Sequence, residues 1–413
     1  MQLNLRMTAT ASAALVAVFL AGCNNATPPA KTVDAAGSAA DATASAVAGA
    51  ASAVAAAATG DAQVVKLASV APMSGSQAHY GKDNANGVQM AVDELNTQGL
   101  VIGGKKIRFE AVLEDDAADP KQGAAVAQKL CDAKVSGVVG HLNSGTTIPA
   151  SKIYNDCNLP MVTGAATNPA LTKPGYKMIF RIIANDNALG ADLANEAKTL
   201  GLKRVAVIDD RTAYGQGIAE VFTDVAKKNG IEIVSQQFTN DKAVDFMSIL
   251  TEIKGKKPDG IFFGGMDAQA APMLRQMETL GMTDVKYFGG DGICTTEIYK
   301  LSSEAQTVSN VICAVGGGAL EKMPKGPDWK ARYDKAFPGQ FQVYSPYTYD
   351  ATMVIVDAMK RADSVDPAVY VTKLAEADYD GVTAKIAFEP NGEMKNPATT
   401  LSGYKDGQKF TIR

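Results

Sequence analysis

The chain has 413 residues, of which 46% are hydrophobic and 20% are charged, and its formal net charge is -4. This length suits two domains, and this composition is typical of an ordinary soluble globular protein. The charge balance and the lack of a long basic run argue against a nucleic acid as the partner.

The first residues have the pattern of an export signal. Arg6 precedes an apolar run over residues 9–21, which is shorter than the roughly 20 residues that a helix needs to cross a bilayer. The run ends in Leu20-Ala21-Gly22-Cys23, and these residues resemble the lipobox of bacterial lipoproteins. The resemblance implies a signal peptide over residues 1–22 and a lipid on Cys23, which places the protein in the periplasm or cell envelope, anchored to a membrane. A plain signal peptide with an incidental cysteine is the alternative.

Residues 23–62 are predicted to form a flexible tether that carries the lipid. Alanine dominates the segment, with scattered Ser, Thr, Gly and Pro. Alanine favours a helix, but the segment has no large apolar face whose burial would offset the entropy of ordering it. The folded body is therefore expected to start near residue 63.

From Val64 onward, short β-branched runs alternate with amphipathic segments. Strands are predicted at residues 64–72, 107–113, 137–141, 160–163, 204–208, 232–238, 260–264 and 285–289. Helices are predicted at residues 84–96, 121–131, 148–156, 190–200, 217–229, 246–254 and 270–280. Strands that alternate with helices form βαβ units and parallel sheets. The pattern restarts after residue 163, so the sequence predicts an α/β protein with two doubly wound parallel-sheet lobes.

Small and polar residues follow several predicted strands, where such sheets bind their ligands. Small residues let a ligand approach backbone N–H groups, and Ser or Thr adds a hydroxyl. Two lobes whose loops face each other form a cleft that closes by hinging. The loops are at residues 72–75, 141–145, 164–167, 264–267 and 289–292.

Four cysteines lie in the predicted body: Cys131, Cys157, Cys294 and Cys313. An even number in an exported protein suggests disulfides, and three pairings are possible. The first two end consecutive predicted helices, and the last two flank one helix–loop unit, which favours Cys131–Cys157 and Cys294–Cys313. A metal site is the alternative, but the chain has no CxxC motif and its two histidines are far apart in sequence.

The sequence lacks the motifs of the common enzyme and nucleotide-binding classes. It contains no GxxxxGK[ST] phosphate loop and no GxSxG nucleophile elbow. Ser402-Gly403-Tyr404-Lys405 fits S-x-x-K, but its partner motifs are missing. We therefore expect no catalysis, no cofactor and no metal.

Several short motifs together resemble those of one family. They are Ala71-Pro72-Met73-Ser74-Gly75, Asp115-Asp116 followed by Asp119-Pro120-Lys121-Gln122, Gly140-His141-Leu142, Pro149-Ala150-Ser151, Ala166-Thr167-Asn168-Pro169 with Leu171-Thr172, Tyr214-Gly215, and Met273-Leu274-Arg275-Gln276. From about Val64 to the C-terminus, the sequence resembles the leucine/isoleucine/valine-binding proteins, the type I periplasmic binding proteins of branched-chain amino acid ABC transporters.

The resemblance implies a particular arrangement of the two lobes. Three crossover strands would join them, near residues 181–185, 314–318 and 396–401. The N-terminal lobe would then comprise residues 63–183 and 316–397, and the C-terminal lobe residues 184–315 and 398–413.

The resemblance also implies a function. It is that of an extracytoplasmic solute-binding lipoprotein, a monomer that binds a branched-chain or similar amino acid in the interlobe cleft and serves an inner-membrane ABC permease. One alternative is a receptor of the same fold for an amide, urea or small carboxylate. Another is a sensory binding module.

Family positions that hold an amino acid match residues of this chain. The ligand carboxylate would meet Ser144 and the Thr167 backbone, with Ala166 beside them. The ammonium would meet the Ala165 carbonyl, the Thr167 hydroxyl and Asp291. A buried zwitterion needs both donors and an anion, because burying either charge unpaired is costly. On local sequence alone, Asp291 also suits a turn and Thr167 a helix cap.

Three aromatic residues and three departures from the family complete the predicted site. Tyr214 and Tyr344 match aromatic contact positions, and Tyr80 lines the side-chain end; Tyr80 and Tyr344 are also compatible with ordinary packing. Met266 replaces a Tyr of the branched-chain binders, Asn143 replaces a disulfide Cys, and Asp291 is one methylene shorter than the family Glu. Tyr80 and Asn143 leave room for a more polar ligand side chain, so the amino-acid class is implied and leucine in particular is not.

Overall fold

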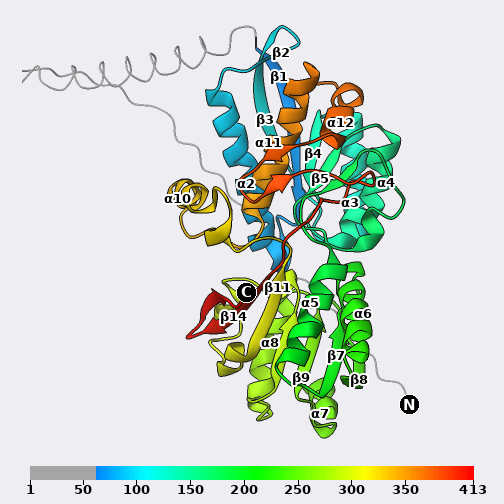
Figure 1. Ribbon diagram of the computed structural model, residues 1–413, viewed down its shortest axis with the longest axis vertical. Coiled ribbons are helices and arrows are strands. Elements are labelled where there is room, and N and C mark those ends of the chain that lie inside the picture. The colour runs from blue at the N-terminus through cyan, green and yellow to red at the C-terminus, as the bar shows by residue number, and fades with distance from the viewer. Residues whose placement is uncertain (1–61) are drawn as a thin grey trace, which may run out of the picture. The chain divides into compact units, whose positions relative to one another are not determined.

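The computed structural model describes residues 62–413. The predicted signal peptide, the predicted lipidation site Cys23 and nearly all of the predicted tether lie outside the described residues. Among the described helices, none is both long and apolar enough to cross a membrane. Figure 1 shows the described residues as two lobes, each built on its own sheet.

The N-terminal lobe is a six-stranded sheet with helices on both faces. Its strand order is β2-β3-β1-β4-β5-β6, and only the β2–β3 pair is antiparallel. The strands are β1 (Gln63–Ala71), β2 (Val101–Ile102), β3 (Lys105–Asp115), β4 (Gly137–Gly140), β5 (Met161–Thr163) and β6 (Ile179–Arg181). The helices are α2 (Ala78–Thr97), α3 (Pro120–Asp132), α4 (Ser144–Asp156), α10 (Gly326–Ala336), α11 (Ser345–Ala362) and α12 (Pro367–Ala375).

Strand β1 shows why helices cover both faces of this sheet. Side chains alternate between the two faces of a strand, so a strand buried on both sides is apolar at nearly every position. Val65 and Leu67 join the core formed with α2 and α11, whereas Ala68 and Val70 join the core formed with α3 and α4. Helix α11, drawn in orange in Figure 1, comes from late in the sequence yet packs beside α2.

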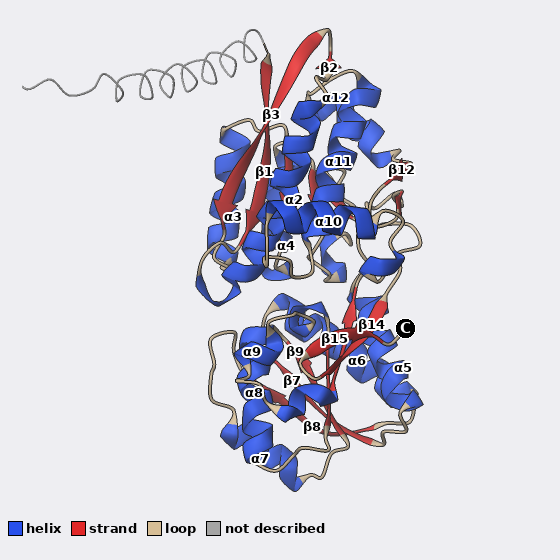
Figure 2. Cartoon of the chain, turned by 90° about the vertical axis from the view of Figure 1, so that its left-hand side faces the viewer, coloured by secondary structure: helices blue, strands red, loops and turns tan. Residues whose placement is uncertain are grey.

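The C-terminal lobe is a seven-stranded sheet of order β15-β14-β11-β10-β9-β7-β8. Strand β14 pairs antiparallel with both β11 and β15, and all other pairs in this sheet are parallel. Figure 2 shows its helices around the sheet. The strands are β7 (Arg204–Asp209), β8 (Glu232–Phe238), β9 (Gly260–Gly264), β10 (Lys286–Gly289), β11 (Val311–Val315), β14 (Thr400–Lys405) and β15 (Gln408–Thr411). The helices are α5 (Asp186–Thr199), α6 (Ala213–Lys228), α7 (Met247–Gly255), α8 (Asp267–Thr279) and α9 (Ile298–Leu301).

The chain passes between the two sheets three times: after β6, after β11 and before β14. A short β12 (Tyr379–Asp380) and β13 (Lys385–Ile386) pair precedes the last passage. The parallel strands of both sheets run through two-sided cores, and this confirms the predicted α/β class with two doubly wound lobes.

Several helices begin earlier than the sequence pattern predicts. Helix α4 starts at Ser144 and α6 at Ala213, whereas the predicted starts are residues 148 and 217. The first turns carry small or polar residues because they lie at the strand ends and not over the apolar sheet. Because these first turns lack apolar periodicity, the sequence pattern predicts loops there. The predicted helix starts are therefore wrong by about one turn.

Two disulfides stabilise the ends of helices and strands. Cys131 and Cys157, at the ends of α3 and α4, have their Cα atoms 6.1 Å apart. Cys294 and Cys313 have their Cα atoms 5.4 Å apart and fasten the segment after β10 to β11. The two disulfides close loops with sequence separations of 26 and 19 residues. Such a disulfide stabilises a fold chiefly by restricting the conformations of the unfolded chain.

Candidate functional site

A small cavity lies between the strand-end loops of the two lobes. Its volume is about 10 Å³. Its lining contains eight of the predicted binding residues and, in addition, Leu142, which the sequence reading missed because an apolar residue in a loop carries no chemical signal. The lining residues are Leu142, Asn143, Ser144, Ala165, Thr167, Tyr214, Met266, Asp291 and Tyr344.

Ser144 is the first residue of α4 and is buried. The backbone N–H of Asn168 donates to Ser144 Oγ at 3.1 Å, which leaves the hydroxyl hydrogen free to donate to another group. The N-terminus of a helix favours negative charge, because its first N–H groups have no partner within the helix. This end of the cavity therefore suits a carboxylate.

The opposite chemistry lies at Thr167 and Asp291. Thr167 Oγ1 and Asp291 Oδ2 are buried and have no hydrogen-bond partner, while Asp291 Oδ1 accepts from the N–H of Gly292 at 3.1 Å. An unpartnered buried polar atom costs about 1–3 kcal/mol, so such atoms are uncommon unless a ligand uses them. A hydroxyl oxygen and a carboxylate oxygen are both acceptors for an ammonium group.

A second buried carboxylate lies close to Asp291. Burial, and then the negative charge of Asp291, raises the pKa of Asp186 to about 8, so Asp186 is protonated at neutral pH. Burial also raises the pKa of Asp291 to about 6, although the nearby hydroxyls of Tyr214 and Tyr344 oppose this shift. The site therefore presents one negative charge at neutral pH, and Asp291 carries it.

Asp291 begins the 3-10 turn η3 (Asp291–Ile293), which packs tightly on its surroundings. The N–H of Gly292 donates to the Tyr214 hydroxyl at 3.1 Å. A Cβ at Gly292 would lie 2.6 Å from the carbonyl oxygen of Gly265, so only glycine allows this approach. The short side chain of Asp291 is thus held against the cavity by a closely packed loop.

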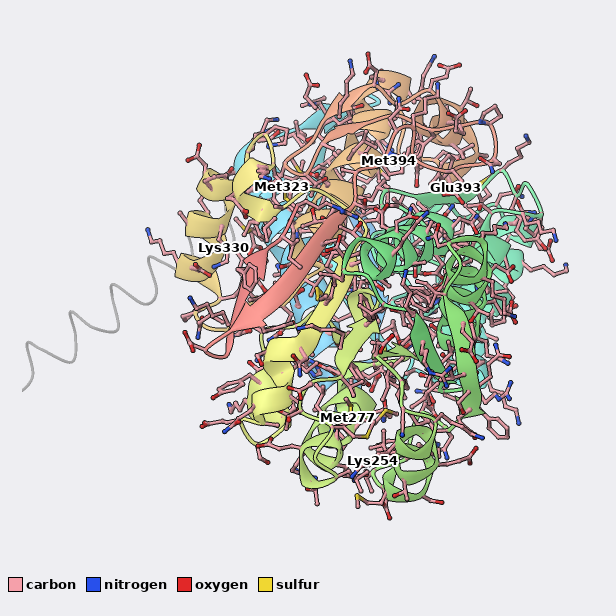
Figure 3. All side chains as sticks on the ribbon, turned by 60° about the horizontal axis from the view of Figure 1, so that its bottom comes forward. Lys254, Met277, Met323, Lys330, Glu393 and Met394 are labelled. Atoms are coloured by element: carbon pink, nitrogen blue, oxygen red, sulfur yellow. A yellow bond between two sulfur atoms is a disulfide. The ribbon has the colours of Figure 1, made fainter. Side chains whose placement is uncertain are left out.

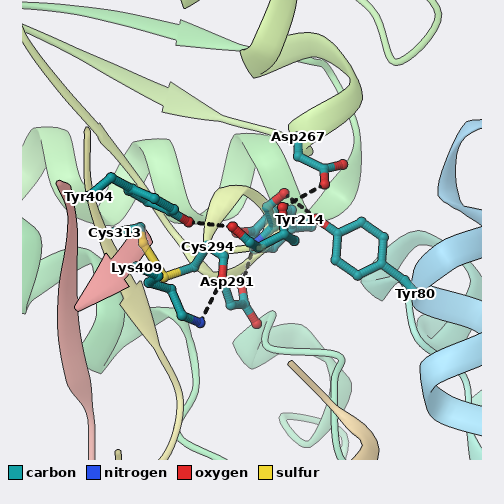
Figure 4. Close-up of a disulfide and its surroundings, with 10 residues drawn as sticks. Tyr80, Tyr214, Asp267, Asp291, Cys294, Cys313, Tyr404 and Lys409 are labelled. Atoms are coloured by element: carbon teal, nitrogen blue, oxygen red, sulfur yellow. Dashed lines mark hydrogen bonds between the residues drawn. A yellow bond between two sulfur atoms is a disulfide. The ribbon is translucent and has the colours of Figure 1, made fainter. Parts of the chain in front are cut away.

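Further along the same loop, the C-terminal hairpin adds support (Figure 4). The ammonium of the half-buried Lys409 donates to the carbonyl of Cys294 at 3.0 Å, and the Tyr404 hydroxyl donates to the carbonyl of Thr295 at 2.7 Å. Burial lowers the pKa of Lys409 to about 8. No sequence pattern indicates these two supports, since they depend on the return of β14 and β15 to the C-terminal sheet.

Arg181 fixes the loop that carries Thr167. Its guanidinium is fully buried and donates to the carbonyls of Ala166 and Asn168 at 3.1 and 2.9 Å. It also pairs with Glu393, which is labelled in Figure 3 and lies between β13 and β14. Ala166, a predicted binding residue, does not line the cavity; its carbonyl is held by Arg181 instead. The sequence reading missed Arg181, which it placed in a crossing.

Two residues at the start of α2 reach across the cleft. The Tyr80 hydroxyl donates to the carbonyl of Gly292 at 2.8 Å, and His79 Nε2 lies 2.9 Å from Asp267 Oδ2. Burial is the largest single influence on the pKa of His79 and lowers it. The hydrogen bond to Asp267 and the negative charge of its carboxylate outweigh burial, so the pKa of His79 is raised. Tyr80 does not line the cavity. The structure places it as a bridge between the lobes, beside the ring of Tyr344.

No cluster of three or more metal-ligating side chains occurs among residues 62–413. His141 Nδ1 lies 2.8 Å from Asp116 Oδ2, and its Nε2 lies 2.9 Å from the Tyr154 hydroxyl. Both nitrogens of this buried histidine are thus used within the N-terminal lobe, and its role is structural.

Two doubly wound lobes that meet at a cavity with unpartnered polar atoms define the class of bilobed solute-binding proteins. A family model described as "Periplasmic binding protein" matches residues 64–408, and the chain belongs to this family. The predicted family is thereby confirmed.

Individual relatives agree with this assignment. The chain is 32% identical to the leucine-, isoleucine-, valine-, threonine-, and alanine-binding protein of Pseudomonas aeruginosa, over 85% of this chain and 93% of the relative. It is 30% identical to the Leu/Ile/Val/Thr-binding protein of Salmonella typhimurium, over 81% and 89% of the two chains. Among solved structures, LivJ of Streptococcus pneumoniae in complex with isoleucine matches with a TM-score of 0.77 and 27% identity, over 85% of this chain and 99% of LivJ.

Proposed function

We propose that this chain is the extracytoplasmic receptor of an ABC transporter and binds an α-amino acid in the interlobe cavity. The observation that carries the proposal is the pair of unpartnered acceptors, Thr167 Oγ1 and Asp291 Oδ2, in one small cavity that also contains a helix N-terminus. The amino acids named for the relatives support the same class of ligand.

The proposed contacts follow from charge and hydrogen-bonding capacity. The ligand carboxylate lies at the start of α4, where the Ser144 hydroxyl donates to it. The ammonium donates to Thr167 Oγ1, to the ionised Asp291 and to the carbonyl of Ala165. Each charge of the zwitterion then has partners, which burial requires. Tyr214, Tyr344, Met266 and Leu142 close the cavity around the rest of the ligand.

Closure is the proposed mechanical step. Tyr80 and His79 on α2 bond to the C-terminal lobe, so these contacts exist only while the lobes are together. A ligand that touches both lobes favours the closed arrangement, because it binds that arrangement better than the open one. The proposed receptor delivers its ligand as a monomer to an inner-membrane permease that recognises this arrangement.

Thermal unfolding with a panel of ligands tests the proposed function. Protein freed of ligand by unfolding and refolding is mixed with each of the twenty amino acids, several amides, urea and small carboxylates. A ligand present at about 100 times its dissociation constant stabilises the fold by roughly 2.7 kcal/mol. A stabilising α-amino acid supports the proposal. Stabilisation by an amide, urea or carboxylate alone would contradict the role given to Asp291.

We also propose that a lipid on Cys23 anchors the receptor to a membrane. Cys23→Ser removes the thiol that would carry the lipid, and the variant is expected in the soluble fraction after cell lysis, whereas the unchanged chain sediments with membranes. Fractionation and immunoblotting measure this. Cys294→Ser together with Cys313→Ser is the matched control, since it removes two other sulfurs and should leave the chain on the membrane. Sedimentation of Cys23→Ser with membranes would rule the anchor out.

A further inference from the structure

The cavity holds one more buried acceptor than a bare zwitterion uses. Besides Thr167 Oγ1 and Asp291 Oδ2, Asn143 Oδ1 is buried and without a hydrogen-bond partner. The ligand carboxylate is itself an acceptor and gives Asn143 Oδ1 no hydrogen. The ammonium is assigned to Thr167, Asp291 and the Ala165 carbonyl. Within the proposed site, therefore, Asn143 Oδ1 remains for another donor.

The nitrogen and the oxygen of the Asn143 amide have different surroundings. Asn143 Nδ2 donates to Oε1 of the buried Gln77 at 2.8 Å, which leaves the oxygen of the amide unused. Asn143 also occupies the N-cap position of α4, where asparagine commonly bonds to the backbone of the helix, yet it makes no such bond. Its side chain is thus committed neither to the helix nor to a second protein group.

Asn143 lines two neighbouring cavities at once. A wider cavity of about 370 Å³ adjoins the small one, and the two share Asn143, Tyr214 and Met266 in their linings. Gln77 and Asp210 also line the wider cavity, and Asp210 Oδ2 is another buried oxygen without a partner. A side chain that points this way meets hydrogen-bond acceptors at the boundary.

We propose that the site prefers α-amino acids whose side chain carries a hydrogen-bond donor, a hydroxyl or a carboxamide, over aliphatic ones of the same shape. The inference rests on the proposed function and adds the chemistry of the ligand side chain, with Asn143 as the residue that determines specificity. An aliphatic side chain would leave Asn143 Oδ1 buried and unpaired, and a site built for a hydroxyl discriminates strongly against the analogue that lacks it.

Threonine and valine provide the test, because they differ only in a hydroxyl in place of a methyl group. Isothermal titration of the ligand-free protein is expected to show threonine binding roughly tenfold more tightly than valine, or better. Asn143→Leu keeps the branched shape without polar atoms and is expected to abolish or reverse this preference. Asn143→Asp keeps an acceptor and is expected to retain the preference, even if both affinities fall. Circular dichroism confirms that each variant is folded.

The outcomes separate this inference from the proposed function. Equal or tighter binding of valine to the unchanged protein would overturn the inference and leave the amino-acid receptor standing; this comparison requires no variant. An unchanged threonine-to-valine ratio in a folded Asn143→Leu protein would overturn the role of Asn143. If no α-amino acid binds at all, the proposed function fails, and the inference fails with it.

Discussion

Asp291→Ala is expected to weaken amino-acid binding by roughly tenfold or more, because it leaves the ligand ammonium without its only anionic partner in the cavity. Thr167 Oγ1 and the Ala165 carbonyl remain, but both are neutral acceptors. Isothermal titration with the tightest ligand of the panel measures the loss. Unchanged affinity would show that the ammonium lies elsewhere and would contradict the proposed site.

Two further variants show whether the loss of affinity in Asp291→Ala comes from a direct contact between the Asp291 carboxylate and the ligand. Ser144→Ala is expected to weaken binding less than Asp291→Ala, because backbone N–H groups at the start of α4 still face the carboxylate. Asp284→Ala removes an exposed carboxylate of the same lobe and is expected to leave affinity unchanged. A loss as large for Asp284 as for Asp291 would indicate a general electrostatic effect instead of a contact.

The affinity should also depend on pH through Asp291. Burial raises its pKa to about 6, so the ligand-free carboxyl is ionised above that pH and protonated below it. The ammonium requires the ionised form, and its binding therefore weakens as the pH falls through about 6. At pH 5, roughly one carboxyl in eleven is ionised, and affinity should be about tenfold lower than at pH 7.5. Asp291→Asn, measured over the same range, should lack this dependence; a similar fall in Asp291→Asn would assign it to another group, such as His79.

Arg181→Met is expected to have the largest effect on stability, a loss of about 3–5 kcal/mol in the free energy of unfolding. The change leaves Glu393 without its cation and the carbonyls of Ala166 and Asn168 without their donor. Because the same loop carries Thr167, ligand affinity should fall as well. Urea unfolding of the ligand-free protein measures the first effect, and titration at low temperature measures the second.

Arg108→Met is the matched control for Arg181→Met. Arg108 pairs with Glu110, but about 40% of each side chain is exposed, so solvent screens the pair. Exposed ion pairs contribute about 0–1 kcal/mol, and the control is expected to unfold at nearly the same urea concentration as the unchanged protein. Equal losses for the two variants would mean that Arg181 contributes no more than a surface charge.

Much of the fold is predictable from the sequence, because the central parallel strands of each sheet are buried on two sides. Residues 260–264 are apolar at consecutive positions, residues 64–72 are apolar except at Lys66 and Ser69, and Gly-rich or polar loops end both runs. The polar residues of the cavity follow those strands directly, which is why Ser144, Thr167 and Asp291 were identifiable. Physical reasoning about strand ends and the resemblance to a family led to the same three positions.

The supports of the site were not predictable in the same way. Arg181, Lys409 and Tyr404 bond to backbone carbonyls of segments far away in the sequence. No local pattern marks such a contact, since any buried cation or hydroxyl needs an acceptor and the sequence does not say which one. Tyr80 was predicted at the side-chain end of the ligand, but its hydroxyl bonds to Gly292 instead, because α2 begins at Ala78 and turns Tyr80 toward the other lobe.

The pairing of β14 with β11 makes the order of folding depend on both lobes. Between these strands the chain builds α11 and α12, which pack in the N-terminal lobe. Until Thr400–Lys405 returns to pair with β11, that strand is an open edge whose N–H and C=O groups are available to other chains. A nascent or partly refolded chain that lacks this last strand is thus prone to aggregate. The contact joins strands far apart in the sequence, and such long-range pairing slows folding.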